Sequence, residues 1–374
     1  MPEIRSFDIP TDNKVQHEQP APLVSVKGSH RQIGQAMGEA CRAQVHQHVA
    51  NTHELLIASY ASLQLSWDGA VIQARKYLPF AQERYPQYVD ELLGIAEGAD
   101  VAFDDVMVIN AIEAVTMDAL HLTKCTSFAV NQDLTTDGHV LVGHNEDWLP
   151  EDEPLVYLVN AEPNDEPPFL AMTYGALLPN IGFNAYGIAQ CCDSVYPKDS
   201  RIGLPRVILS RAILAARTPS EAIRRAIIPH RAAGYNHLLV HDSGEMYNVE
   251  VSARRFAILY GDEGFLAHTN HYLDYDMQSV ENEPDELIDT RVRYFRAYRF
   301  LYRTEIHSLR TLQNIQRDHL NFPNSICNHS EIESHALQRE KTINALIMDL
   351  TSRVMHLAWG TPCCNSYHPY YLSA

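Results

Sequence analysis

Residues 125–148, CTSFAVNQDLTTDGHVLVGHNEDW, decide the fold of this chain. Apolar and polar residues alternate in SFAVNQD and in GHVLVGHNED, which is the period of a β-strand. Thr136, Asp137 and Gly138 lie between the two runs and are typical of a hairpin turn. The stretch therefore predicts two antiparallel strands, the first of which begins at Cys125.

The sequence before this stretch has the period of helices instead. GQAMGEACRAQVHQHVANTHELLIASY carries apolar residues at helical spacing, and Pro86 and Asp104 stand where further helices are expected to begin. We expect residues 1–22 to be a loosely attached polar arm and residues 30–120 to be mostly helical. Helix-rich and strand-rich stretches thus meet close to Cys125, where a cut could leave a stable two-piece protein.

The sequence after residue 148 alternates between short strands and helices. Strands are expected at 153–161, 168–175, 180–184, 186–192, 255–260 and 264–270, with hairpins over 237–252 and 344–359. Helices are expected at 204–216, 219–228, 288–304 and 308–318. Antiparallel hairpins flanked by helices indicate a layered α+β architecture rather than a doubly wound parallel sheet.

Charge and cysteine content narrow the function classes. Lys and Arg total 29 and Asp and Glu total 47, so the net charge is −18, and we expect neither nucleic acid nor a membrane surface as partner. The polar start has no signal-peptide core, and no uncharged apolar run is long enough to span a membrane. Seven cysteines with two adjacent pairs are a poor disulfide framework and lack C-x-x-C zinc spacing. A reduced, cytoplasmic protein is expected.

Cys125 differs from the other cysteines in its surroundings. A cysteine is more often a small buried apolar residue than a nucleophile. However, the hairpin can bring Asn145 or Asp147 beside Cys125, and a predicted strand ends at His268-Thr-Asn270-His271. A thiol with an acid and an amide nearby is a candidate nucleophile.

These motifs together resemble the isopenicillin-N acyltransferase (acyl-coenzyme A:6-aminopenicillanic acid acyltransferase) family of the N-terminal nucleophile hydrolases. The resemblance covers nearly the whole chain and includes GSHRQIGQAMGEA and ELLGIAEGADVAFDDVMVIN upstream of the cysteine. The later blocks, in the family's order, are Cys125-Thr126, Gly143-His-Asn-Glu-Asp147-Trp148, Gly182-Phe-Asn-Ala-Tyr-Gly187, Gly203-Leu-Pro-Arg, His268-Thr-Asn-His271, Phe322-Pro-Asn-Ser-Ile-Cys327 and Gly360-Thr-Pro362.

The resemblance implies a four-layer αββα sandwich of two antiparallel sheets, made as a precursor that cuts itself between Lys124 and Cys125. Residues 1–124 would then be a helix-rich pro-segment that becomes the small chain, and residues 125–374 the catalytic chain, packed together as one globular unit. By the same resemblance Cys125 is the nucleophile, Asp147 the active-site aspartate and Asn270 the oxyanion-stabilising asparagine. A well-known relative has glycine before the cysteine, whereas this chain has Lys124.

The residues support this chemistry independently of the family. A thiol at a free N-terminus has its own base, an α-amine with a pKa of about 7.7–8.0. Attack on an amide gives a thioester and an oxyanion, for which the Asn270 NH2 is a suitable donor and Asn236 a second candidate. Asp147 is expected to orient other groups, since a carboxylate touching the amine would raise the amine's pKa. Tyr174, Phe183 and Tyr186 are candidates for lining an acyl pocket.

Other functions remain open on the sequence alone. A metal-dependent hydrolase could use ligands drawn from His144, Glu146, Asp147, His268 and His271, but their spacing on strands is unfavourable. A non-catalytic binding protein of the same fold and an uncleaved, papain-like thiol enzyme are further alternatives. We expect an amidase or acyltransferase that takes a small N-acyl amide and needs no cofactor or metal; self-association is left open.

Overall fold

The two runs in residues 125–148 form adjacent antiparallel strands, β2 (Lys124–Val130) and β3 (Leu141–Trp148), as predicted. They lie inside a six-stranded sheet of order β11-β2-β3-β12-β13-β14. The other strands are β11 (Phe265–His268), β12 (Lys341–Asp349), β13 (Val354–Trp359) and β14 (Tyr367–Tyr371). The computed structural model describes residues 17, 19–116, 124–282, 287–329 and 340–373.

A second sheet of eight strands faces the first, in the order β1-β4-β5-β6-β7-β8-β9-β10. Its strands are β1 (Leu23–Gly28), β4 (Val156–Pro163), β5 (Phe169–Tyr174), β6 (Ile181–Asn184), β7 (Ile188–Ser194), β8 (Tyr235–His241), β9 (Met246–Val251) and β10 (Phe256–Tyr260). Strand β2 packs on β7 across the space between the sheets. Within the described ranges, neighbouring strands of both sheets are antiparallel except for β1 and β4, a parallel pair that the sequence did not predict.

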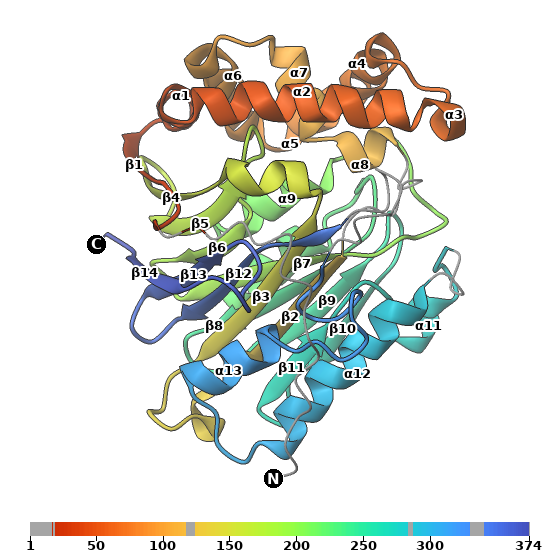
Figure 1. Cartoon of the computed structure of the whole chain (residues 1–374). Coiled ribbons are helices and arrows are strands. Elements are labelled where there is room, and N and C mark those ends of the chain that lie inside the picture. Colours follow the sequence, from red (N-terminus) through yellow and green to blue (C-terminus); the bar gives the residue numbers. More distant parts are fainter. Residues whose placement is uncertain (1–16, 18, 117–123, 283–286, 330–339, 374) are drawn as a thin grey trace.

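Helices cover the outer face of each sheet, which gives the expected four layers (Figure 1). Those over the eight-stranded sheet are α1 (His30–Ala40), α2 (Arg42–Ala58), α3 (Tyr60–Leu63), α4 (Trp67–Arg75), α5 (Leu78–Arg84), α6 (Pro86–Ala99), α7 (Phe103–Ile109), α8 (Ile112–Val115), α9 (Arg206–Ile213) and α10 (Pro219–Ala226). The six-stranded sheet is covered by α12 (Ile288–Arg303) and α13 (Leu309–Gln316), whereas α11 (Tyr275–Gln278) contacts β10 of the eight-stranded sheet. Because both faces of the six-stranded sheet are covered, β3 is buried along its entire length.

The segment before residue 125 is built into this architecture. Strand β1 adds to the eight-stranded sheet, and Glu91 of α6 forms a fully buried ion pair with Arg211 of α9. Helices α1 and α6 are in direct backbone contact, since a Cβ atom at Gly34 would lie 1.9 Å from the carbonyl oxygen of Glu91. None of the helices in the described ranges is long and apolar enough to cross a membrane.

Candidate active site

Cys125 lies at the second position of β2, with only 2% of its surface exposed. Its backbone N–H donates a hydrogen bond to Oδ1 of Asn270, which follows β11, with a distance of 2.7 Å. The side-chain NH2 of Asn270 donates to the carbonyl oxygen of Ser194 at 3.0 Å. The structure therefore brings together the predicted nucleophile and the predicted oxyanion residue at one end of the six-stranded sheet.

Arg293 of α12 is a member of this site that the sequence analysis did not identify. Its guanidinium donates to the carbonyl oxygen of Cys125, to Oγ1 of Thr126 at 3.1 Å and to Oδ1 of Asn270 at 2.8 Å. The side chain is 1% exposed. No local motif marks Arg293, because it is one of many arginines in a helix and only the fold aims it at Cys125.

Asp147 lies opposite Lys124 in the β2–β3 register, one position away from Cys125. Its Oδ1 accepts a hydrogen bond from Oγ1 of Thr342 at 2.6 Å. Burial raises the pKa of Asp147 to about 7, although the positive charge of Arg293 and the Thr342 hydrogen bond act against this rise. Asp147 is thus placed beside the peptide bond between Lys124 and Cys125.

The residue directly opposite Cys125 is Glu146, which the sequence analysis considered only as a metal ligand. The Cys125 thiol donates to Oε2 of Glu146 at 3.8 Å, and Nε2 of His144 lies 2.8 Å from the same oxygen. Burial raises the pKa of the Cys125 thiol well above its usual range, and the negative charges of Glu146 and Asp193 add to this effect. The surroundings of the sulfur therefore favour the neutral thiol over the thiolate.

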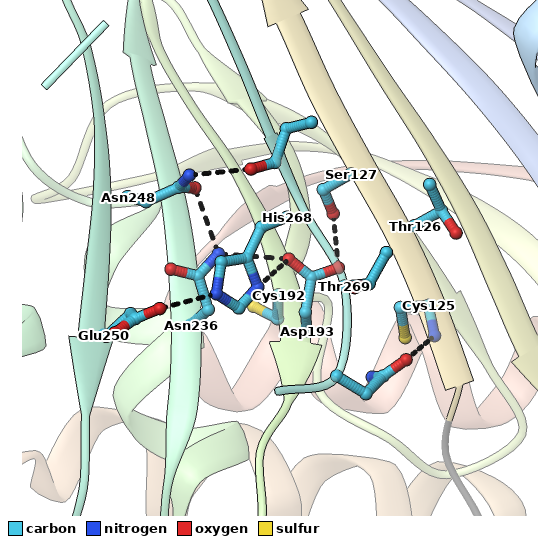
Figure 2. Close-up of polar contacts among 12 residues, drawn as sticks. Cys125, Thr126, Ser127, Cys192, Asp193, Asn236, Asn248, Glu250, His268 and Thr269 are labelled. Atoms are coloured by element: carbon cyan, nitrogen blue, oxygen red, sulfur yellow. Dashed lines mark hydrogen bonds and ion pairs between the residues drawn. The ribbon is translucent and has the colours of Figure 1, made fainter. Parts of the chain in front are cut away.

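A buried chain of polar contacts leads from His144 through Ser127 to the second sheet. Figure 2 shows the part of it that runs from Ser127 to Asp193 and His268. Oγ of Ser127 donates to Oδ1 of Asp193 at 2.7 Å, so it accepts from Nδ1 of His144 at 2.9 Å. His268 lies between Asp193, at 3.4 Å, and Glu250, at 2.9 Å. Burial lowers the pKa of His268, but the two carboxylates outweigh this and raise it to about 9. His268 is consequently a buried cation, held by acidic partners on either side.

Asn236 belongs to this second region. Its NH2 donates to Oδ2 of Asp193 and to Oδ1 of Asn248, both at 3.1 Å. Both amide hydrogens are engaged in these contacts, because an amide NH2 has two. Asn236 therefore orients Asp193 and has no amide hydrogen left to donate to Cys125.

The five residues considered for a catalytic metal do not converge. A ring nitrogen of His144 and a carboxylate oxygen of Glu146 lie within 4.8 Å of each other and of the Cys125 sulfur. Asp147 instead contacts Thr342, His268 contacts Glu250, and His271 contacts the hydroxyl groups of Thr269 and Thr290.

A pocket leads to the Cys125 thiol. Its walls are mostly apolar and aromatic and come from both sides of residue 125: Ile109, Ala111, Ile112 and Ala114 precede it, and Trp148, Tyr174, Leu177, Ile181, Val207 and Tyr235 follow it. Tyr174 was expected here, whereas Phe183 is part of the hydrophobic core and Tyr186 is 48% exposed. Glu113 and Arg206 form an ion pair in the pocket wall.

Two sheets between helical layers, with a cysteine at the start of an inner strand, define the fold of the N-terminal nucleophile hydrolases. The sequence profile of the acyl-coenzyme A:6-aminopenicillanic acid acyl-transferase family matches residues 134–363, and the chain belongs to this family. The matched range begins after Cys125 and does not include the cysteine itself.

The chain is also similar to individual proteins. The chain is 24% identical to the acyl-coenzyme A:6-aminopenicillanic-acid-acyltransferase 40 kDa form of Emericella nidulans, over 91% of this chain and 92% of that protein. It is 26% identical to the β-alanyl-dopamine/carcinine hydrolase of Drosophila melanogaster, over 63% of this chain and 65% of that protein. Among solved structures it is similar to penicillin V acylase from Agrobacterium tumefaciens, with 15% identity and a TM-score of 0.44. The match covers 63% of this chain and 83% of that chain.

Proposed function

We propose that this chain is a self-processing N-terminal cysteine amidohydrolase or acyltransferase, with Cys125 as nucleophile. One observation carries the proposal: Cys125 has its N–H fixed by Asn270, its carbonyl fixed by Arg293 and its thiol at the end of an apolar pocket. The family membership supports acyl chemistry of this kind.

The first reaction cuts the bond between Lys124 and Cys125. The thiol gives its proton to a base, and the Glu146 carboxylate can be this base because the thiol already donates a hydrogen bond to it. The sulfur then attacks the carbonyl carbon of Lys124. The C–N bond breaks as the nitrogen takes up a proton, which leaves a thioester and a free α-amine on Cys125. Water then hydrolyses the thioester, so Lys124 gains a carboxylate and the thiol is restored.

The restored thiol carries out the second reaction, on the substrate. Its own α-amine, with a pKa of about 7.7–8.0 when unperturbed, accepts the thiol proton as the sulfur attacks a substrate amide. The Asn270 NH2 is proposed to stabilise the oxyanion, a role in which one donor contributes on the order of 2.7–4 kcal/mol. The leaving amine takes a proton, and water or another amine then removes the acyl group from the sulfur. Asp147 and Asn236 orient their neighbours in this scheme.

The pocket indicates the substrate class. Its apolar and aromatic walls suit an acyl chain, and Cys125 lies where the acyl carbonyl would be attacked. We therefore propose a small N-acyl amide as substrate. Residues 1–124 and 125–374 would remain together as two noncovalently associated chains in the cytoplasm.

An uncleaved, papain-like enzyme is the second candidate, because a ring nitrogen of His144 lies within 4.8 Å of the Cys125 sulfur. The raised pKa of the thiol argues against it, since a papain-like pair holds the cysteine as a thiolate at neutral pH. Glu146 also lies in contact with both groups.

Intact-mass measurement under denaturing conditions tests the proposal. Wild-type protein should give two chains, residues 1–124 and 125–374, and Cys125→Ala should give one chain of 374 residues. Cys192→Ala is the matched control, because this cysteine lines the same pocket and its loss should leave cleavage intact. Incubation with small N-acyl amides should then add an acyl mass to the 125–374 chain. An active enzyme that stays in one piece would overturn the cleavage mechanism.

A further inference from the structure

A second group of reactive side chains lies apart from the Cys125 thiol. It consists of His319, Cys327, His329 and Cys363, whose ligand atoms all lie within 4.8 Å of one another. The first three follow α13, and Cys363 lies between β13 and β14. Two chain segments therefore supply two imidazoles and two thiols to one point.

The contacts of His329 exceed what hydrogen bonding can satisfy. Its Nε2 lies 3.2 Å from Nε2 of His319, 3.4 Å from Sγ of Cys327 and 3.6 Å from Sγ of Cys363. A ring nitrogen carries either one hydrogen or one lone pair, so it makes one hydrogen bond in its own plane. Hydrogen bonds alone therefore do not account for three partners around one nitrogen, whereas one atom bound by all four side chains would.

The same distances match the edges of a coordination tetrahedron. Zinc–sulfur bonds of about 2.3 Å and zinc–nitrogen bonds of about 2.0 Å at tetrahedral angles place two nitrogens about 3.3 Å apart and nitrogen and sulfur about 3.5 Å apart. The observed separations of 3.2, 3.4 and 3.6 Å lie on either side of these values.

We propose that His319, Cys327, His329 and Cys363 bind one Zn²⁺ ion in a tetrahedral Cys2His2 site. Two sulfur and two nitrogen ligands are a set that selects zinc over magnesium or calcium. Four protein ligands leave no open position for water or substrate, so the site is structural rather than catalytic. The two cysteines bind as thiolates and release their protons as the metal enters.

The site has a short connection to the scissile bond. Asn328 lies between two of the ligands and exchanges hydrogen bonds with Thr342: its N–H donates to Oγ1 at 2.9 Å, and its carbonyl accepts from the Thr342 N–H at 3.0 Å. The Thr342 hydroxyl donates to Asp147, opposite Lys124. The metal would thus hold the loop around Asn328, which bonds to Thr342, and Thr342 in turn positions Asp147. The metal would take no part in the reaction.

Metal analysis of the full-length, reduced protein, produced with zinc supplied, tests the site. We expect about one Zn²⁺ per chain. Replacing it with Co²⁺ should give the strong visible absorption of a tetrahedral ion and a thiolate-to-cobalt charge-transfer band, both reaching a plateau at one equivalent. Absence of bound zinc and of this spectrum in wild-type protein would overturn the proposal, whatever the variants do.

Adjacent cysteines provide a matched pair of variants. Cys364→Ser should keep the full zinc content, because Cys364 is outside the ligand set although its sulfur lies 3.4 Å from that of Cys363. Adding Cys363→Ser to that variant removes both thiols at this position. It should weaken zinc binding at least tenfold and leave at most the charge-transfer band of one thiolate, Cys327.

Two further measurements locate the metal. Cys125→Ser should retain the zinc; loss of zinc there would mean that the ion binds at the cluster of Cys125, His144 and Glu146 instead. A disulfide between Cys327 and Cys363 in protein purified without reductant and with zinc present would also contradict the site, because a disulfide cannot supply two thiolate ligands.

Discussion

The N–H of Cys125 and Oδ1 of Asn270 are joined by a hydrogen bond of 2.7 Å, although 145 residues separate them in the sequence. Arg293 donates to the same oxygen at 2.8 Å. The nitrogen of the bond that we propose is cut is thus held by the Asn270 amide, and Arg293, a buried cation, fixes the orientation of that amide. After cleavage the same oxygen would accept from the α-amine and keep it beside the thiol.

Substitutions at Asn270 test its side-chain oxygen and its side-chain NH2 separately. Produced as two separate chains, Asn270→Leu should lower turnover by about a hundredfold or more, because the oxyanion loses a donor. Asn270→Asp keeps an oxygen for the Cys125 amine but has no NH2, and it should be equally impaired. Asn184→Leu, at the buried asparagine that ends β6, controls for loss of a buried amide. Near-normal turnover in Asn270→Leu would move the oxyanion role to another donor.

Arg293 should be needed for stability as well as for activity. Arg293→Lys should lower the free energy of unfolding by about 2–4 kcal/mol, because hydrogen bonds to charged groups contribute about 1.5–3 kcal/mol and one ammonium group cannot reach three acceptors in a planar fork. Urea unfolding measures this change. Arg299→Lys, at an exposed position of the same helix, should alter stability by no more than about 0.5 kcal/mol. Equal effects of the two substitutions would contradict the role given to Arg293.

Asp147 should make the stability of the protein depend on pH. Its pKa is about 7 in the folded chain and about 3.9 in an unfolded one. Between these values the folded chain binds a proton that the unfolded chain does not, so stability falls as pH rises from about 4 to about 7. The loss is on the order of 4 kcal/mol and levels off above pH 7. Asp147→Asn should lack this component.

The comparison is made by measuring both proteins at each pH. The stability of Asp147→Asn relative to wild type should rise between pH 4.5 and 7.5, since all other titrating groups are shared. Parallel stability curves over this range would mean that Asp147 ionises normally in the folded protein.

The identity of the base can be tested by one extra residue. In a protein made as two chains, a single alanine added before Cys125 keeps His144 and Glu146 but moves the α-amine away from the sulfur. This variant should fold and lose nearly all activity. In the unextended two-chain enzyme, the acid limb of kcat/KM should report an amine pKa near about 7.7–8.0, lower if burial dominates. Full activity with the extra alanine would identify a side chain as the base.

Much of the architecture could be predicted because its signals are local. The alternation around the 136–138 turn predicted β2 and β3, and the change of period at Cys125 predicted where helices give way to sheet. Strand β1 was missed because a short parallel strand depends on β4, which lies over a hundred residues later.

The site was predicted less completely, for two physical reasons. The connection between β2 and β3 is longer than a tight turn, so it does not fix the register, and Glu146 rather than Asn145 or Asp147 lies opposite Cys125. Arg293 joins a helix to the six-stranded sheet, and the contact between Ser127 and Asp193 joins the two sheets. Contacts between layers of the fold cannot be predicted from the local sequence pattern.

Strand β1 and the pocket wall at residues 109–114 have a consequence for the two-chain protein that the proposed cleavage would produce. A small chain that adds a strand to a sheet and lines the pocket would stay bound after cleavage, unlike an inhibitory peptide that dissociates. Once the chain is cut, unfolding separates two molecules instead of one, so the melting temperature should rise with protein concentration. The uncut Cys125→Ala protein should melt at the same temperature at every dilution. Cleavage would thus convert a single covalent chain into an obligate heterodimer. Refolding of the heterodimer would require the two chains to associate.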